Sequence, residues 1–331
     1  MFLCLWKKMR RFLAVVLLCI LFVSAVTVYV LTKRSPLSLK IGIFYYVWYN
    51  PAWDFSWNKS KIIDQPILGY YDSSDPAIIN QHIRNISDLD IDFVVVSWWG
   101  FYDDYGRFTD TAAKQVFKVA KDSKSNLKFA IMVEPFNKSD GPYNYAEIYN
   151  HVYDNFAMPF SSFYYNDSKP LICFFNDPDH VPGLTNNGTV PTDERFNVVL
   201  VGQQNYTQWI YTDLNIYDKP AHDPYNQTAV TPSYDDSHFR NLSYPVDVSL
   251  SQGVYDQEWE NAIRLWKEGK IDTIMITSWN EYTERTAIEP HYNPSATNPD
   301  PWFLYNKTKH YIDQIKPLRV NRIASSNPRN K

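Results

Sequence analysis

Short runs of apolar residues recur along this chain, separated by longer polar or amphipathic stretches. Most runs are continuous rather than alternating, and they are rich in β-branched and aromatic residues, which favour strands. A strand that is apolar at successive positions is covered on both faces, as in a parallel sheet. We therefore predict eight strands: Ile41–Tyr49, Phe93–Trp99, Leu127–Glu134, Pro170–Phe175, Asn197–Val201, Asp213–Tyr217, Ala229–Tyr234 and Ile271–Ile276.

Helical patterns fill most of the intervals between these runs. Pro76–Leu89 begins after Asp75, a suitable N-cap followed by Pro at the first helical position. Strands that alternate with helices predict a single (β/α)8 TIM barrel of the α/β class. Its connections around strands 5 to 7 are irregular, because Asn205–Tyr211 is a short helix at best and Asp218–Thr228 contains two prolines. The other predicted helices are Thr111–Lys121, Tyr143–Phe156, Asp256–Lys267 and Phe303–Ile315.

The amino-terminal segment has the pattern of a membrane anchor. Phe12–Leu31 is an uncharged apolar span of 20 residues, which at ~1.5 Å per residue crosses a hydrocarbon core of about 30 Å. Four basic residues precede the span and two follow it, which predicts an amino terminus inside and the remaining chain on the extracytoplasmic side. We read the span as a transmembrane signal anchor. A cleaved signal peptide, with Ser24-Ala25-Val26 as a weak site, is the alternative.

The chain beyond the anchor fits one extracytoplasmic domain. We expect a cytoplasmic basic tail at 1–11, the anchor at 12–31, a linker at 32–40, the barrel domain at 41–318 and a polar carboxyl-terminal tail at 319–331. Nine Asn-x-Ser/Thr sequons agree with this topology and predict a glycoprotein. They begin at Asn58, Asn85, Asn137, Asn166, Asn187, Asn205, Asn226, Asn241 and Asn306.

Composition and motifs exclude several kinds of function. The net charge of −4 comes without a basic stripe, so we expect no nucleic-acid partner. Cys173 is alone in the globular part, and the histidines lack metal-ligand spacing, so we expect no disulfide and no metal. The sequence has no Gly-rich phosphate loop, and we expect no cofactor. The 17% aromatic content suggests flat surfaces on which sugar rings could stack.

Polar and aromatic residues gather at the carboxyl ends of the predicted strands, which form one rim of a barrel. The last strand leads into Trp279 and Asn280 and then into two glutamates, Glu281 and Glu284. Two such acids could be solvated loop charges, but seven other strands also end in polar or aromatic residues. Two acids on one rim can cleave a glycosidic bond. From this rim we select Trp99, Tyr234, Asp235 and Asn280 as candidate substrate-binding residues.

At these residues the chain resembles glycoside hydrolase family 99, the endo-α-mannosidase family, and its relatives. The likeness runs from about Ile41 to Ile315. It is carried in order by Phe44-Tyr-Tyr-Val-Trp-Tyr49, Leu68-Gly-Tyr-Tyr-Asp-Ser-Ser-Asp-Pro76 with His82, Val96-Ser-Trp-Trp99, Val133-Glu-Pro-Phe136, Pro232-Ser-Tyr-Asp-Asp236 with Arg240, and Thr277-Ser-Trp-Asn-Glu-Tyr-Thr-Glu284 with Ile288-Glu-Pro290.

The resemblance implies a retaining hydrolase that acts on α-mannosides or related α-linked glycans without a cofactor. The residue matching Glu281 is expected to deprotonate the 2-hydroxyl of the sugar, whose oxygen attacks the anomeric carbon to give a 1,2-anhydro sugar. The residue matching Glu284 protonates the leaving oxygen, so we expect surroundings that favour its neutral form. The match also places four further residues around the sugar: Tyr46, Trp98, Glu134 and Tyr217.

The chain departs from the family pattern next to the two acids. The family commonly has His between the glutamates and Gly after the second, where this chain has Thr283 and Arg285. The connection between strands six and seven is also shortened. A cation at Arg285 would oppose protonation of Glu284 unless its side chain points elsewhere. The alternative hypotheses are a non-catalytic glycan-binding barrel in surface polysaccharide assembly and a structural cell-surface protein.

Overall fold

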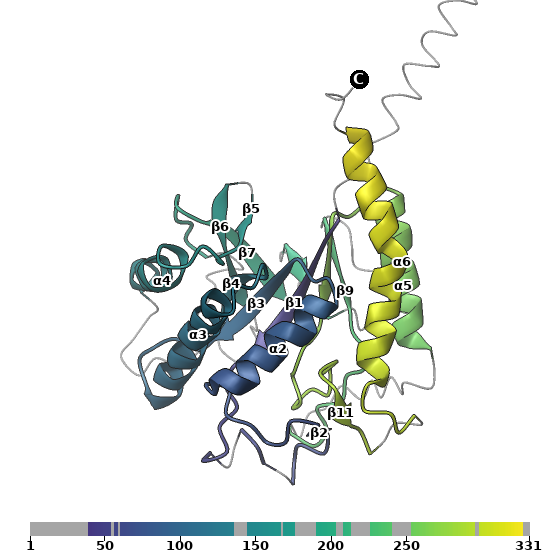
Figure 1. Ribbon diagram of the computed structural model, residues 1–331. Coiled ribbons are helices and arrows are strands. Elements are labelled where there is room, and N and C mark those ends of the chain that lie inside the picture. Colours follow the sequence, from purple (N-terminus) through teal and green to yellow (C-terminus); the bar gives the residue numbers. More distant parts are fainter. Residues whose placement is uncertain are drawn as a thin grey trace, which may run out of the picture.

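The computed structural model describes residues 39–53, 56–58, 60–135, 144–166, 168–175, 190–202, 208–212, 226–239, 253–294 and 298–326 (Figure 1). The predicted anchor and its flanks, the strand Asp213–Tyr217 and the sequon residues Asn137, Asn187, Asn205 and Asn241 lie outside these ranges. No helix within them is long and apolar enough to cross a membrane. The signal anchor therefore stays a prediction.

Eight strands form a mostly parallel, nearly closed barrel. Neighbouring strands follow the order of the chain, and the last strand pairs with the first, with Lys40 opposite Thr273 and Ile43 opposite Ile276. Every pair along this path is parallel. The strands are β1 (Lys40–Tyr46), β3 (Phe93–Trp98), β4 (Lys128–Val133), β6 (Lys169–Phe175), β7 (Asn197–Gly202), β8 (Trp209–Ile210), β9 (Gln227–Val230) and β10 (Thr273–Ile276).

A side chain bridges the remaining interval in the barrel, between β8 and β9. The Ile210 N–H donates to Oε1 of Gln227 at 2.7 Å, and Nε2 of Gln227 donates to the Ile210 carbonyl at 3.1 Å. The amide therefore takes the place of a backbone ladder at this point. It can do so because an amide carries both a donor and an acceptor, as a peptide group does.

Helices lie outside the strands (Figure 1). The Asp75 carboxylate caps the first of them by accepting from the Ala77 N–H at 2.8 Å, which confirms the predicted start. In chain order the helices are α2 (Pro76–Asp88), α3 (Asp104–Asp122), α4 (Tyr145–Val152) with its π-helical continuation η1 (Tyr153–Ala157), α5 (Val254–Lys267) and α6 (Phe303–Ser326). Helix α6 thus extends past residue 318, where we expected the barrel domain to end.

Short antiparallel strand pairs accompany the parallel strands of the barrel. Strand β5 (Tyr165–Asn166) pairs with the start of β6. Strands β2 (Gln65–Pro66) and β11 (His291–Tyr292) pair with each other, and both belong to loops at the end of the barrel where β1 and β10 terminate. This small sheet joins the loop after β1 to the loop after β10.

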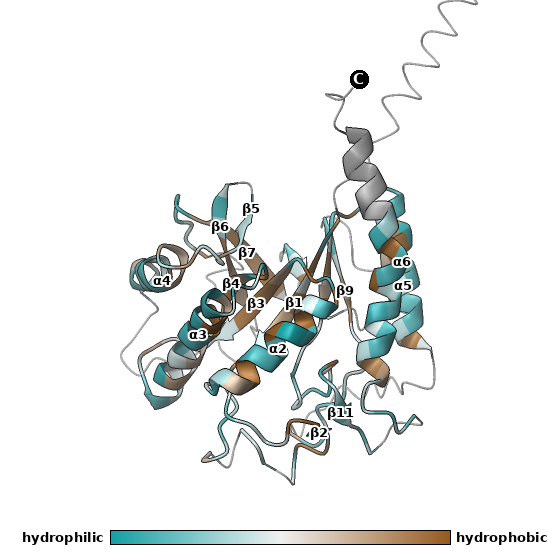
Figure 2. Cartoon of the chain, in the orientation of Figure 1, coloured by the Kyte–Doolittle hydropathy of each residue, from teal (hydrophilic) through white to brown (hydrophobic). Residues whose placement is uncertain are grey.

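Apolar side chains alternate between two cores, one inside the barrel and one beneath the helices. The strands β1 and β3 are largely hydrophobic in Figure 2, whereas the helices around them are mostly hydrophilic. On β3, Phe93 and Val95 belong to the inner core, and Val94, Val96 and Trp98 belong to the outer core. The alternation follows from the two-residue period of a strand. Because both faces of each strand are covered, the sequence shows a continuous apolar run.

The inner core leaves no room for a side chain on Gly42 of β1. A Cβ atom added there would meet the Sδ atom of Met275 and would lie 2.5 Å from Cζ of Phe93, and both residues belong to neighbouring strands. We predict that Gly42→Ala lowers the free energy of unfolding by roughly 1–3 kcal/mol through overpacking. Urea denaturation followed by tryptophan fluorescence would measure this. A variant as stable as the wild type would contradict the close packing of these three residues.

The sixth strand of the described barrel, β8, lies at Trp209–Ile210, within the stretch that the sequence pattern assigned to a short helix. The predicted strand Asp213–Tyr217 lies outside the described residues and stays a prediction. The pairing of β8 with β7 involves only two positions, Val201 with Trp209 and Gly202 with Ile210. Such a short strand needs no apolar run, because the Gln227 side chain satisfies part of its backbone.

Candidate active site

Both predicted catalytic acids lie on one folded loop after β10. The Ser278 N–H donates to the Thr286 carbonyl at 2.8 Å, and the Ile288 N–H donates back to the Ser278 carbonyl at 3.0 Å. Within this loop the Thr286 N–H donates to the Glu281 carbonyl at 3.1 Å. The Thr277–Ser278 peptide bond is cis. These bonds define a compact turn that presents Glu281 and Glu284 from the same segment.

Glu281 is almost fully buried, at 1% exposure. Its N–H donates to Oγ of Ser278 at 2.8 Å, which fixes the main chain at this residue. Its Oε1 atom accepts from the Thr283 N–H at 2.9 Å and from the Thr283 hydroxyl. Two donors on one oxygen stabilise the carboxylate form. Thr283, which replaces the usual His of the family pattern, therefore orients Glu281.

Glu284 is only partly buried, and a tyrosine holds its carboxyl group. The Tyr211 hydroxyl donates to Oε2 of Glu284 at 3.1 Å, and the Tyr46 hydroxyl lies 2.6 Å from the Tyr211 hydroxyl. Either of the two tyrosine hydroxyls can donate in the second bond. Burial, followed by the charge of Glu284, raises the pKa of Tyr211 well above its ordinary value. Tyr211 therefore stays a donor throughout the neutral range.

A third glutamate joins this pair around Tyr46. Glu134, predicted at the end of the third strand, is 4% exposed. Burial, followed by the charges of Glu134, Glu281 and Glu284, raises the pKa of Tyr46 well above its ordinary value. The structure thus brings three predicted acids around one predicted tyrosine. Such a set can exchange protons and bind hydroxyl groups.

Aromatic rings with partly accessible faces continue from this cluster. Trp48 lies 5.0 Å from Tyr46 and 5.6 Å from Trp99, measured between ring centroids, and Trp99 lies 5.5 Å from Tyr105. Trp48, Trp99 and Tyr105 are each partly buried rather than enclosed. The predicted position of Trp99 next to the acids is therefore compatible with stacking on a sugar.

Asn280 joins the end of β1 to the loop that carries the acids. Its Oδ1 atom accepts from the Tyr46 N–H at 2.8 Å, and its Nδ2 atom donates to the Tyr46 carbonyl at 2.9 Å and to the Tyr71 hydroxyl at 3.0 Å. The Tyr49 hydroxyl donates to the Asn280 carbonyl at 2.8 Å and accepts from the Tyr282 N–H at 3.0 Å. We expected Asn280 to bind substrate. Its full burial and the use of both amide hydrogens correct this to a supporting position.

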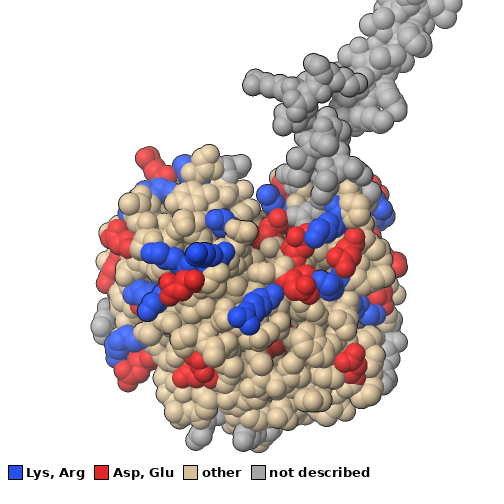
Figure 3. Space-filling view, in the orientation of Figure 1, with Lys and Arg blue, Asp and Glu red and all other residues tan. Residues whose placement is uncertain are grey.

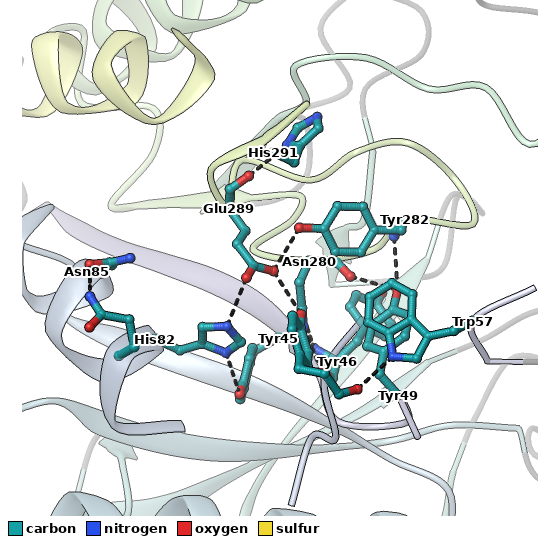
Figure 4. Close-up of polar contacts among 12 residues, drawn as sticks. Tyr45, Tyr46, Tyr49, Trp57, His82, Asn85, Asn280, Tyr282, Glu289 and His291 are labelled. Atoms are coloured by element: carbon teal, nitrogen blue, oxygen red, sulfur yellow. Dashed lines mark hydrogen bonds and ion pairs between the residues drawn. The ribbon is translucent and has the colours of Figure 1, made fainter. Parts of the chain in front are cut away.

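A buried polar network continues from Asn280 beneath the loop (Figure 4). The Tyr71 and Tyr282 hydroxyls each donate to Oε2 of Glu289 at 2.8 Å, and Nε2 of His82 lies 2.9 Å from Oε1 of Glu289. His82 and Glu289 are each 1% exposed, so neither can reach a ligand. His82 is therefore a packed residue of this network.

Arg285 follows Glu284 with a backbone φ of +56°. A side chain in this left-handed region costs roughly 1–2 kcal/mol, and the usual Gly of the family pattern avoids that cost. The guanidinium points to Asp64, with Nε and Nη2 donating at 3.0 and 3.1 Å, and to Asp235 at 3.1 Å. Arg285 thus points toward other carboxylates, which answers the question that the sequence left open.

Asp235 belongs to this ion-pair cluster. Partial burial opposes its ionisation, but hydrogen bonds from Ser237 and then Arg285 outweigh burial and hold the pKa of Asp235 below its ordinary value. Asp235 was predicted to bind substrate, and its Oδ1 and Oδ2 atoms accept from Ser237 and Arg285. Tyr234 is buried next to it, with its hydroxyl 3.4 Å from Oδ2 of Asp236.

Trp98 does not face the predicted acids. It is fully buried in the outer core, its Nε1 atom donates to Oδ1 of Asp110 at 3.1 Å, and its ring stacks on His151. The expectation that Trp98 binds substrate is therefore corrected to a packing role beneath the helices. Tyr217 lies outside the described residues.

The sequence pattern missed Tyr211 as a site residue. Tyr211 immediately follows β8, so it occupies the same strand-end position as the predicted residues. Correct placement of the sixth strand would have found it. The pattern also missed Tyr105, at the start of α3, whose pKa is raised by burial and then by the charges of Glu134 and Glu281.

Charged residues of both signs occur on the surface of the domain. On the face in Figure 3, acidic and basic residues are mixed, and the lower end, near β2 and β11, is largely uncharged. Among the described residues, no group of three His, Cys, Asp or Glu could hold a metal ion.

Comparison with known proteins finds similarity to one family of glycoside hydrolases. The sequence profile of glycosyl hydrolase family 99 matches residues 60–183, a range that ends before the acid pair. Glycoprotein endo-alpha-1,2-mannosidase of Xenopus laevis is 24% identical over 321 residues, which cover 77% of this chain and 70% of that protein. The Mus musculus protein of the same name is 29% identical over 140 residues, which cover 33% of this chain and 30% of that protein.

A solved structure agrees in fold. The GH99 endo-alpha-mannosidase from Bacteroides thetaiotaomicron has a TM-score of 0.65 and 21% identity, and the alignment covers 85% of this chain and 98% of that one. The fold, the profile and the alignment with the frog protein point to the same family as the motifs around the two acids. The profile match over residues 60–183 and the mannosidase alignments support membership of glycoside hydrolase family 99, and the solved structure agrees with it in fold.

Proposed function

We propose that this protein cleaves α-mannosidic bonds in oligo- or polysaccharides with retention of anomeric configuration. The observation that carries the proposal is the contrast between two acids on one turn. Glu281 is buried with two donors on one carboxylate oxygen, whereas Glu284 is partly exposed and held by the Tyr211 hydroxyl. The two acids thus have different surroundings, as different roles require, and the family resemblance assigns the base to Glu281 and the acid to Glu284. The mannosidase relatives supply the sugar class.

In the first step, Glu281 takes the proton of the sugar 2-hydroxyl, whose oxygen then attacks the anomeric carbon. The bond from that carbon to the leaving oxygen breaks, and Glu284 gives its proton to the leaving oxygen. The product of this step is a 1,2-anhydro sugar. In the second step, Glu284 takes a proton from water and the water oxygen attacks the anomeric carbon. The bond from that carbon to the 2-oxygen breaks, and Glu281 returns the proton to the 2-oxygen. Two inversions at one carbon give net retention.

The supporting residues fix this geometry. Asn280 and Tyr49 hold the loop of Glu281 against the end of β1, and Tyr211 orients Glu284. Trp99, with Trp48, offers aromatic faces to the apolar C–H face of a sugar. We place Tyr46 and Glu134 at the hydroxyl groups, because both lie within the acid cluster.

A digest of a glycan panel tests the proposal. We expect cleavage of α-mannosides, and proton NMR of the first product should show the α anomer before mutarotation. Cleavage of α-glucosides and not of α-mannosides would change the proposed substrate class. A β anomer as the first product would overturn retention. Glycan binding without turnover across the whole panel would favour the non-catalytic barrel.

We also propose the wider arrangement of the chain. The domain is a (β/α)8 barrel with irregular connections around its fifth to seventh strands, held outside the cell by the anchor at 12–31 and carrying glycans on its sequons. The uncharged span with its flanking basic residues supports the anchor. The exposed positions of Asn226 and Asn306 are compatible with modification.

A further inference from the structure

The Arg285 side chain connects three loops at the rim beside Glu284. Its Nε and Nη2 atoms donate to the two oxygens of Asp64, which precedes β2, at 3.0 and 3.1 Å. Its Nη1 atom donates to Oδ2 of Asp235, after β9, at 3.1 Å, and Nη2 also donates to Oδ1 of Asn293, after β11, at 2.8 Å. We call these four residues the Arg285 clamp.

Two further hydrogen bonds hold the backbone carbonyls of Glu284 and Arg285. The Asp235 N–H donates to the Glu284 carbonyl at 2.9 Å, and the Ser233 hydroxyl donates to the Arg285 carbonyl. The backbone of Glu284 and Arg285 is therefore fixed both to the loop after β9 and, through the guanidinium, to the loop before β2. A planar guanidinium bound at two oxygens of one carboxylate defines direction as well as distance.

The clamp is a largely buried unit in which two carboxylates surround one guanidinium. The exposure is 9% for Arg285 and 1% for Asp64, and one cation faces two carboxylates. The hydrogen bonds of the guanidinium in the described part of the chain go to clamp residues, so its charge is compensated within hydrogen-bonding distance. Arg285 therefore acts on Glu284 through the main chain they share.

We propose that Arg285 is a positioning residue for the acid: the clamp fixes the backbone of Glu284 so that its carboxyl group stays against Tyr211 and reaches the leaving oxygen. This inference rests on the proposed role of Glu284 as general acid. It explains why the chain places Arg at a left-handed position where glycine would be unstrained. A displacement of about 1 Å at a proton donor can cost on the order of 100-fold in rate.

The double variant Arg285→Gly/Asp64→Asn tests the proposal. Glycine suits the left-handed backbone, and the neutral amide at 64 avoids a buried unpaired charge, so the fold should survive. We expect kcat/KM for an α-mannosyl oligosaccharide to fall roughly 10- to 100-fold. With the matching α-mannosyl fluoride kcat/KM should fall much less, because fluoride leaves with little help from an acid. Arg285→Lys keeps the positive charge but loses the two-pronged guanidinium. Its kcat/KM for the oligosaccharide should lie between the values of the wild type and the double variant.

Asp256→Asn on α5 is the control, because it removes a partly exposed ion pair with Lys307 of α6 and leaves the clamp intact. It should lower the Tm without changing the ratio of the two kcat/KM values. A clamp variant that keeps the wild-type rate on the oligosaccharide overturns the proposal, and so does an equal fall on both substrates. If the wild type cleaves neither substrate, the proposed function is wrong and the role of Arg285 falls with it.

Discussion

Glu284→Gln will lower kcat/KM for an unactivated α-mannosyl oligosaccharide by roughly 10²- to 10⁴-fold, the contribution of a general acid. Gln has the shape of Glu and still offers an oxygen to the Tyr211 hydroxyl, so the fold and the hydrogen bond of 3.1 Å should be kept. The variant lacks only the proton for the leaving oxygen. Initial rates with the oligosaccharide and with the matching α-mannosyl fluoride would measure the effect.

The leaving group separates this loss from a general defect. The fluoride should remain a substrate of Glu284→Gln, with kcat/KM much closer to that of the wild type. The wild-type decline of kcat/KM at high pH, where the acid loses its proton, should be absent from the variant. Glu268→Gln is the matched control, because it makes the same change at an exposed pair with Arg264 on the far end of α5. Equal activity of Glu284→Gln and the wild type on the oligosaccharide would remove Glu284 from the reaction.

The pattern of apolar runs predicted the barrel well because its strands are covered on both faces. Seven of the eight predicted runs overlap the strands at β1, β3, β4, β6, β7, β9 and β10. The run predicted as the sixth strand lies outside the described residues, and the structure has that strand at Trp209–Ile210. A side chain, Gln227, supplies part of its hydrogen bonding. Apolar periodicity carries no signal for such a contact.

The same covering of both faces explains the error at Trp98. When successive residues are all buried, hydrophobicity does not tell which of two adjacent tryptophans faces the barrel axis. The register of the strand decides which tryptophan faces the barrel axis. Phe93 and Val95 point inward and the intervening residues point outward, so Trp98 joins the outer core.

The two acids could be predicted because a strand end is a fixed place in a barrel, whereas the duties of their polar neighbours depend on distant residues. Asn280 has the composition of a sugar-binding residue, yet it satisfies the backbone of Tyr46, 234 positions away. The sequence also could not show where the Arg285 side chain points. Its effect on Glu284 depends on Asp64 and Asp235, and only the structure shows that these carboxylates surround it.

Glu281→Gln should abolish turnover of both the oligosaccharide and the fluoride, with kcat/KM lowered by roughly 10²- to 10⁴-fold for each. A good leaving group does not replace the base that activates the 2-hydroxyl, so the fluoride should give no rescue. Thr283 would still donate to the amide oxygen of Gln, which preserves the turn. The two glutamine variants thus differ in one readout, the response to the leaving group.

The role of the 2-hydroxyl itself distinguishes Glu281 as a base from Glu281 as a covalent nucleophile. A 2-deoxy-2-fluoro α-mannosyl fluoride has no 2-oxygen, so the anhydro pathway cannot use it, and the intact wild-type protein should show no added mass after incubation. A covalent nucleophile would attack the same compound and retain the sugar as an ester. An adduct on the peptide that contains Glu281 would therefore overturn the participation of the 2-hydroxyl, while leaving retention and the acid role of Glu284 in place.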